Sequence, residues 1–151
     1  MVALRGAGGI FPYQAWWARQ KENTGVVVLF VDSYCTRGYL CENSTGDNDK
    51  KRGAIMRMWD KVSINQRVLD AAEGYRFLAE REFIDNKSIG LIGWSRGGTM
   101  ALAVQRVSKR LQLPNGGFKG TIAFYPNLVH VQGHKQWKKC LKIRQPTLFI
   151  F

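Results

Sequence analysis

The sequence has little that could hold a metal ion. It contains only three cysteines and two histidines among its 151 residues. Cys35, Cys41 and Cys140 form no CxxC pair, and the histidines, His130 and His134, stand apart from them, so the ligand spacing of a zinc site is absent. We therefore expect no metal and no cofactor, and we expect the cysteines to be free thiols. A short disulfide between Cys35 and Cys41 stays open as an alternative, because it would suit an exported protein.

Long hydrophobic runs are also missing. No apolar stretch is long enough to span a bilayer, and Met1 is not followed by the basic segment and hydrophobic core of a signal peptide. Hydrophobic residues nevertheless make up 45% of the chain, which is enough for a real core. We expect one soluble, cytoplasmic domain over residues 1–151 with no membrane partner. Export stays open if an N-terminal segment precedes the chain.

Acidic residues are scarce, with 11 aspartates and glutamates against 23 lysines and arginines, a net charge of +12. Such a balance raises the question of nucleic-acid binding. Outside Lys50–Arg52 and residues 135–144, however, the basic residues are scattered, without interleaved aromatics or a known nucleic-acid motif. We expect a solvated basic surface and no nucleic-acid partner. The alternative, nucleic-acid binding, predicts an affinity that falls steeply with added salt.

The most informative stretch is Gly93-Trp94-Ser95-Arg96-Gly97. This GxSxG pattern is typical of a nucleophile elbow, where a serine occupies a tight turn between a strand and a helix. An apolar run over residues 88–94 predicts the strand. The helix is predicted to start at the serine, because apolar residues recur at three- and four-residue spacings from Thr99 onward: Met100, Ala101, Val104, Val107 and Leu111. In the competing interpretation, Ser95 only caps this helix.

The rest of the chain alternates between strands and helices. We expect strands at residues 2–4, 26–31, 119–125 and 146–151, and helices at residues 12–23, 60–82 and 134–141, with a long surface excursion over residues 34–57. The continuous apolar run of residues 26–31 predicts a strand covered on both faces. This order predicts an α/β domain with a doubly wound, mostly parallel sheet. Because Met1 and Phe151 both fall in strands, we expect the sheet to be unfinished at both ends.

Several blocks of the chain resemble the dienelactone hydrolases, a branch of the α/β-hydrolase fold. They occur in the family's order and extend over nearly the whole chain. The blocks are the glycine-rich loop Gly6-Ala7-Gly8-Gly9, Val31-Asp32-Ser33-Tyr34, Arg67-x-x-Asp70-Ala71, the Ser95 elbow, and Phe118-Lys119-Gly120 leading to Phe124-Tyr125-Pro126.

The resemblance implies hydrolysis of a small-molecule carboxylic ester or lactone through an acyl-enzyme on Ser95. The backbone N–H groups of Arg96 and Ala7 would form the oxyanion hole. Arg52 lies roughly where family members place an arginine that binds a substrate carboxylate, although a plain surface charge is the alternative. The oligomeric state is left open.

The chain departs from the dienelactone enzymes proper in two residues of the site. They use a cysteine nucleophile, where this chain has Ser95, and a glutamate in the glycine-rich loop, where it has Gly6. Relatives with serine often read His-Gly at that point, whereas this chain reads Arg5-Gly6. These differences favour an ordinary serine esterase.

The largest departure concerns the triad, which in this fold runs Ser, Asp, His along the chain. We expect the aspartate and histidine beyond residue 151, together with a C-terminal strand and helix, and we expect early strands to be missing too. The chain is thus predicted to be a partial α/β-hydrolase domain, nearly inert alone. His130 and His134 are expected to be loop residues and Asp32 to order a loop. The alternative is a catalytically inactive binding protein of the same fold.

Overall fold

The computed structural model describes residues 1–39, 61–126 and 145–150. Five short strands and three helices of at least eleven residues make up this part of the chain. In chain order the elements are β1 (Val2–Leu4), α1 (Pro12–Glu22), β2 (Leu29–Val31), the 3-10 turn η1 (Cys35–Arg37), α3 (Ile64–Ala79), β3 (Leu91–Trp94), α4 (Arg96–Val107), the 3-10 turns η2 (Ser108–Arg110) and η3 (Pro114–Gly116), β4 (Thr121–Phe124) and β5 (Thr147–Ile150).

All five strands are parallel and run in the order β2-β1-β3-β4-β5. In the register, Leu4 of β1 pairs with Val31 on one side and with Gly93 on the other. The strand that precedes Ser95 is therefore the central one. Because the strands are parallel, their carboxyl ends meet at one edge of the sheet, where α/β proteins place their ligands.

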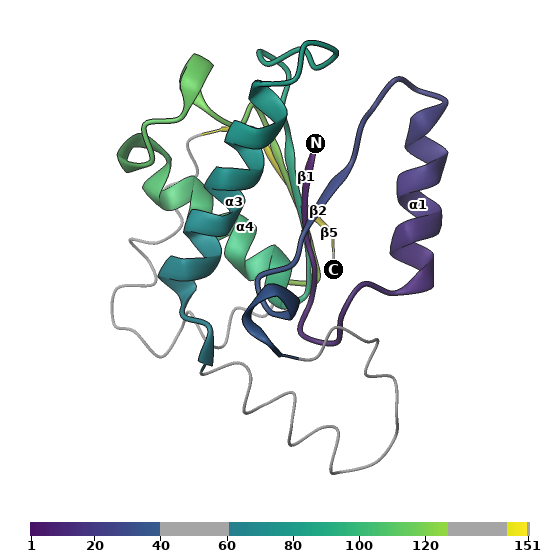
Figure 1. Cartoon of the computed structure of the whole chain (residues 1–151), viewed down its shortest axis with the longest axis vertical. Helices are drawn as coiled ribbons and strands as arrows, with labels where there is room; N and C mark the ends of the chain where they lie inside the picture. Colours follow the sequence, from purple (N-terminus) through teal and green to yellow (C-terminus); the bar gives the residue numbers. More distant parts are fainter. Residues whose placement is uncertain (40–60, 127–144, 151) are drawn as a thin grey trace.

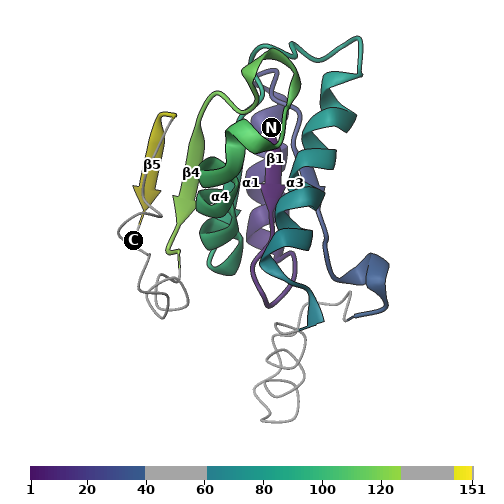
Figure 2. The ribbon, with the colours of Figure 1, turned by 90° about the vertical axis from the view of Figure 1, so that its left-hand side faces the viewer.

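Helices cover both faces of the sheet, as the doubly wound prediction requires. Helices α3 and α4 lie on one face and α1 on the other (Figure 1), and in the perpendicular view α1 lies behind the strands (Figure 2). The strand side chains alternate accordingly. Val2, Leu4 and Leu91 pack with α3 and α4, whereas Ile92 and Trp94 pack on the other face beside Trp17 of α1.

The helix ends follow local sequence signals, and two of them correct the predicted bounds. Helix α3 is shorter than residues 60–82 because Ser63 caps it: the Gln66 N–H donates to the Ser63 hydroxyl at 3.2 Å, and the Ser63 N–H donates to the Gln66 side chain at 2.8 Å. Helix α4 begins at Arg96, directly after Ser95, as predicted. It ends at Val107, so Leu111 lies beyond it.

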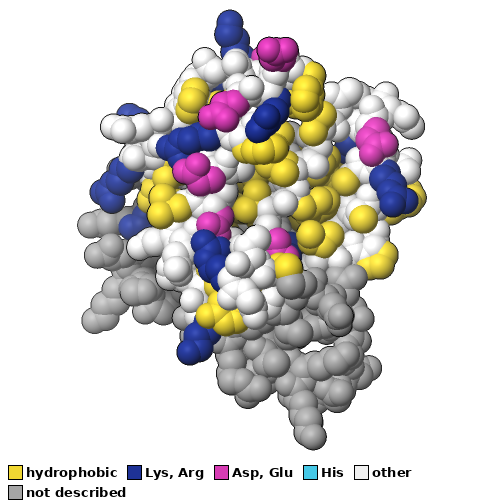
Figure 3. Space-filling model, in the orientation of Figure 1, with side chains coloured by type: hydrophobic (Ala, Val, Ile, Leu, Met, Phe, Trp, Pro, Cys, Tyr) yellow, Lys and Arg dark blue, Asp and Glu magenta, His cyan; other side chains and the backbone are white. Residues whose placement is uncertain are grey.

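Strand β2 is shorter than predicted and lies at one edge of the described sheet. Its side chains contribute to both faces but are only partly buried, so the expectation of a strand fully covered on both faces is wrong. Hydrophobic side chains gather along the middle of the face of the molecule that Figure 3 shows. Val27, which precedes the strand, is 41% exposed. An edge of this kind can pair with further strands.

Two further expectations concern single features. Cys35 is disulfide-bonded, so the expectation of free thiols is wrong for this residue, while Cys41 and Cys140 lie outside the described residues. Within the described part of the chain, no helix is both long enough and apolar enough to cross a bilayer. The predicted helix at residues 134–141 also falls outside that part.

Candidate active site

Ser95 has an unusual backbone conformation at the carboxyl end of the central strand. Its φ of 52° and ψ of −118° lie in a region that residues with a side chain rarely adopt. Such a conformation costs on the order of 1–3 kcal/mol and persists only where the surroundings enforce it. Here the Ser95 N–H donates to the Phe124 carbonyl at 2.9 Å, and the Ser95 carbonyl accepts from the Thr99 N–H at 3.0 Å. These bonds tie the turn to β4 and to the first turn of α4.

The flanking glycines make this turn sterically possible. A Cβ atom at Gly93 would collide with the backbone of Gly97, and one at Gly97 would collide with the Leu4 carbonyl oxygen of β1. Real side chains cannot occupy such positions unless the backbone moves. The close approach of these backbones therefore explains why the GxSxG pattern has glycine at both flanking positions.

The Ser95 hydroxyl does not cap the helix that follows it. Ser95 is the N-cap residue of α4, yet its side chain makes no capping hydrogen bond. The interpretation of Ser95 as a simple helix cap is therefore wrong. The first backbone N–H groups of α4 and its positive dipole end lie at this residue, where negative charge would develop during acyl transfer.

The glycine-rich loop that follows β1 packs against the elbow. A Cβ built on Gly6 would lie 3.3 Å from the Trp94 carbonyl oxygen and 3.5 Å from the Ser95 Cβ. A bridge between Gly6 and Gly9 closes the loop into a tight turn. Ala7 directly follows Gly6 and is buried. The fold thus brings the loop that contains Ala7 against the Ser95 elbow, although Ala7 and Ser95 are 88 positions apart along the chain.

Arg5, immediately before this loop, belongs to a buried polar cluster that the sequence did not reveal. Its side chain is 1% exposed, and its Nε lies 2.7 Å from Oδ1 of Asp32. That carboxylate also accepts hydrogen bonds from the N–H groups of Tyr34 and Cys35 at 2.9 and 3.0 Å. The expectation that Asp32 orders a loop is confirmed, and its ion pair with Arg5 is new.

Arg67 of α3 completes the cluster. Its Nη2 donates to the Arg5 carbonyl at 3.0 Å, and its guanidinium lies 5.1 Å from the centre of the Tyr34 ring. Arg5 lies over the same ring at 4.7 Å. The pKa of Arg67 is lowered to about 10, mainly by burial. Tyr34 partly offsets this effect, and the positive charges of Arg96 and Arg5 contribute smaller lowering effects.

Two tyrosines join across the same edge of the sheet. The hydroxyls of Tyr13 and Tyr125 lie 2.7 Å apart, and Tyr125 directly follows Phe124, which accepts the Ser95 N–H. Burial, and then the hydrogen bond with Tyr13, raise the pKa of Tyr125 above its ordinary value. Both rings are about half exposed, at 50% and 46%. They are therefore accessible from solvent beside the elbow.

Other predicted site residues cannot be placed. Arg52, His130 and His134 lie outside the described residues, which contain no histidine. Within residues 1–39, 61–126 and 145–150, no group of three potential metal ligands comes together.

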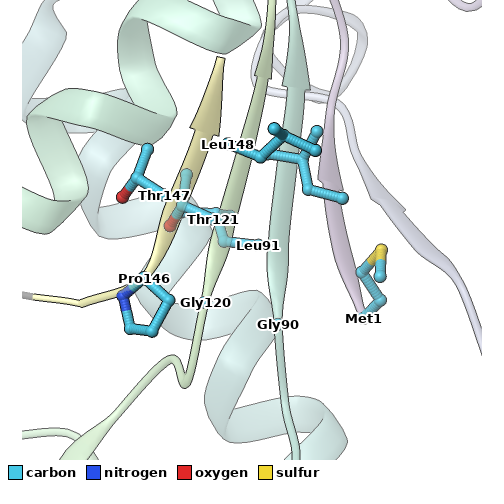
Figure 4. Close-up of a pocket in the computed structure, with 9 residues that line it drawn as sticks. Met1, Gly90, Leu91, Gly120, Thr121, Pro146, Thr147 and Leu148 are labelled. Atoms are coloured by element: carbon cyan, nitrogen blue, oxygen red, sulfur yellow. The ribbon is translucent and has the colours of Figure 1, made fainter. Parts of the chain in front are cut away.

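A pocket of about 480 Å³ lies at the opposite edge of the sheet from Ser95. Figure 4 shows Met1, Gly90, Gly120 and Pro146 around it, at the amino ends of the strands. Because ligands of open parallel sheets bind at the carboxyl ends of the strands, this pocket is not part of the Ser95 site.

Comparison with known proteins agrees with this geometry. The profile of the dienelactone hydrolase family matches residues 14–151. The chain belongs to the dienelactone hydrolase family. No curated protein matches the chain.

A solved structure shows the same fold as this dienelactone hydrolase family member. It is a protein of Klebsiella pneumoniae subsp. pneumoniae MGH 78578, provisionally described as a dienelactone hydrolase, with a TM-score of 0.65 and 17% sequence identity. The similarity covers 85% of this chain and 48% of that chain, so the present chain spans about half of the relative's length. The resemblance read from the sequence blocks is thereby confirmed for family and fold.

The close approach at the elbow makes a stability prediction. We expect Gly97→Ala to lower the free energy of unfolding by more than about 2 kcal/mol, because the new methyl group meets the backbone oxygens of Leu4 and Arg5. Urea unfolding followed by circular dichroism measures this. In the control Gly90→Ala, the Cβ would lie 3.7 Å from the Gly120 oxygen, and we expect a loss below about 1 kcal/mol. Equal losses in the two variants would contradict the steric account.

The tyrosine pair makes a titration prediction. Because the folded protein raises the pKa of Tyr125, the stabilisation that its neutral phenol provides is present below about pH 10 and is lost as the pH rises through the folded-state pKa. We expect Tyr13→Phe to move the Tyr125 pKa back toward its ordinary value, as seen in ultraviolet titration of the phenolate. Tyr39→Phe, which removes a different phenol, should leave the Tyr125 transition in place. An unmoved Tyr125 transition in Tyr13→Phe would contradict the assigned cause.

Proposed function

We propose that Ser95 is the nucleophile of a serine hydrolase that cleaves a carboxylic ester or lactone of a small molecule. The observation that carries this proposal is the Ser95 backbone, with φ of 52° and ψ of −118°, combined with a hydroxyl that makes no capping bond. A strained serine at the carboxyl end of the central strand has no evident structural use for its hydroxyl, and a nucleophile requires that arrangement.

In the proposed reaction the Ser95 Oγ attacks the carbonyl carbon of the ester while a base takes its proton. The carbonyl oxygen becomes an oxyanion, which accepts hydrogen bonds from the backbone N–H groups of Arg96 and Ala7. Collapse of the tetrahedral intermediate breaks the bond to the alcohol oxygen, which takes up the proton, and leaves an acyl group on Ser95. Water then hydrolyses this acyl-enzyme. Each oxyanion donor contributes roughly a hundredfold or more to such a rate.

The base and its orienting acid are proposed to come from outside the sequence given. The described residues contain no histidine, and the chain spans 48% of its structural relative. In this fold the aspartate and histidine follow the nucleophile along the chain. We therefore place the triad aspartate and histidine beyond residue 151, and residues 1–151 alone are expected to be nearly inert.

Residues at the mouth of the site fit a small substrate. The Tyr13–Tyr125 pair and the Phe11 ring, which stacks on Tyr13 at 5.7 Å between centroids, provide an aromatic surface beside the elbow. Apolar surface with a few hydroxyls suits an uncharged acyl or alcohol group. Arg52 keeps its proposed role as a contact for a substrate carboxylate, on family resemblance alone.

The competing function, an inactive binding protein of the same fold, has one point of support in the sequence. That support was Arg5 in place of the histidine that serine-containing relatives often carry. In the structure Arg5 is buried in an ion pair with Asp32, so the substitution has a defined place in the fold. A replaced residue with such contacts is no sign of a decayed site.

A covalent probe tests the proposal. We expect a fluorophosphonate to label the full-length protein on Ser95, and Ser95→Ala to abolish the labelling, because the probe reacts only with an activated serine hydroxyl. Ser108→Ala is the matched control and should be labelled like the wild type. Residues 1–151 alone should react at least about a thousandfold more slowly, since they lack the base. A folded full-length protein whose Ser95 stays unlabelled would contradict the proposal.

A further inference from the structure

The peptide group that links Arg5 to Gly6 is held from three directions. Arg5 is the last residue before the loop that carries the Ala7 N–H, and its side chain is 1% exposed. A buried guanidinium is strongly destabilising unless it is paired, so its position is fixed by its partner. That partner is Asp32, whose Oδ1 lies 2.7 Å from the Arg5 Nε.

Asp32 is itself immobilised at the end of β2. The backbone N–H groups of Tyr34 and Cys35 both donate to its Oδ1. The carboxylate is thus fixed to the chain that leaves β2, and the ion pair ties the end of β1 to the end of β2. Removing one partner of such a pair leaves the buried charge of Arg5 uncompensated, which costs more than the loss of a surface salt bridge.

The carbonyl of Arg5 is held from the other two sides. Arg67 of α3 donates a hydrogen bond to it at 3.0 Å. On the side of the elbow, a Cβ at Gly97 would lie only 2.8 Å from the same oxygen, so the first turn of α4 packs directly against it. The orientation of the Arg5–Gly6 peptide plane, and with it the start of the loop, therefore depends on α3, α4 and β2 together.

We propose that the Arg5–Asp32 ion pair, together with the Arg67 hydrogen bond, is a positioning device that holds the Ala7 N–H in place for the oxyanion. Arg5 and Asp32 touch no substrate in this account; they act through the backbone of the glycine-rich loop. The inference rests on the proposed function for its catalytic consequence. Its structural part, the ordering of Ala7, stands independently of that function.

The test compares two aspartates in matched surroundings. The side chain of Asp32 is 21% exposed and pairs with Arg5 at 2.7 Å, whereas that of Asp70 is 20% exposed and pairs with Arg37 at 2.8 Å, away from the loop. Asp32→Asn keeps an oxygen that can accept from Tyr34 and Cys35 but removes the charge that holds Arg5. Asp70→Asn removes an equivalent charge from a pair that does not touch residues 5–9.

The first readout is the backbone mobility of Ala7 in the full-length protein, measured by ¹⁵N relaxation. We expect an order parameter of about 0.85 in the wild type and in Asp70→Asn, and a value below about 0.6 in Asp32→Asn.

The second readout is steady-state ester hydrolysis. Asp32→Asn should lower kcat by roughly 10- to 100-fold with little change in KM, since the oxyanion contact is made in the transition state. Arg5→Gln should behave like Asp32→Asn, and Arg5→Lys should recover part of the loss.

The outcomes separate the two proposals. An Ala7 order parameter and a kcat that are unchanged in Asp32→Asn, or reduced equally in Asp70→Asn, would overturn the positioning role. If the wild type shows no hydrolysis and no labelling of Ser95, the proposed function falls, while the relaxation data still decide whether the ion pair orders Ala7. Should Asp32→Asn fail to fold, Arg5→Lys and Arg5→Gln supply the same comparison.

Discussion

The close approach of the first turn of α4 to strands β1 and β3 is the constraint on which the site depends. Gly93 and Gly97 leave no room for a side chain, so the backbones of two strands and one helix meet within contact distance. This contact forces Ser95 into its unusual conformation and aims the amino end of α4 at the serine. It also places the carbonyls of Leu4 and Arg5 against the elbow. Ser95, the proposed nucleophile, and the glycine-rich loop are thus parts of one packed unit.

A cluster of buried charged side chains lies beside this packed unit and holds the start of the glycine-rich loop. Arg5 and Arg67 both lie over the Tyr34 ring, from β1 and α3, and Asp32 supplies the nearby negative charge. Burying a guanidinium is costly: burial is the main cause that lowers the pKa of Arg67 to about 10, and the positive charge of Arg5 adds a smaller lowering effect. Such a cluster limits the arrangements open to the chain, because each cation has few positions in which it is compensated.

The family and the fold of the chain are shown by the comparisons, whereas its reaction is a proposal that is consistent with both. Membership in the dienelactone hydrolase family is shown by a match over residues 14–151, and the parallel sheet with helices on both faces agrees with a solved relative. Within that family frame, Ser95 and its surroundings support an ester or lactone hydrolase that uses serine. The chain spans about half of its structural relative, so the remaining catalytic groups belong to the proposal for the whole protein.

The sequence by itself determined the order of strands and helices and the elbow at Ser95, because hydrophobic periodicity and glycine spacing are local signals. It misjudged the start of α3 and the burial of β2, since the start of α3 depends on the Ser63 cap and the burial of a strand depends on its position in the sheet. Only the tertiary structure decided that Arg5, Asp32 and Arg67 form one cluster, and that Tyr13 meets Tyr125. These contacts join residues 27 to 112 positions apart, and no local pattern encodes them.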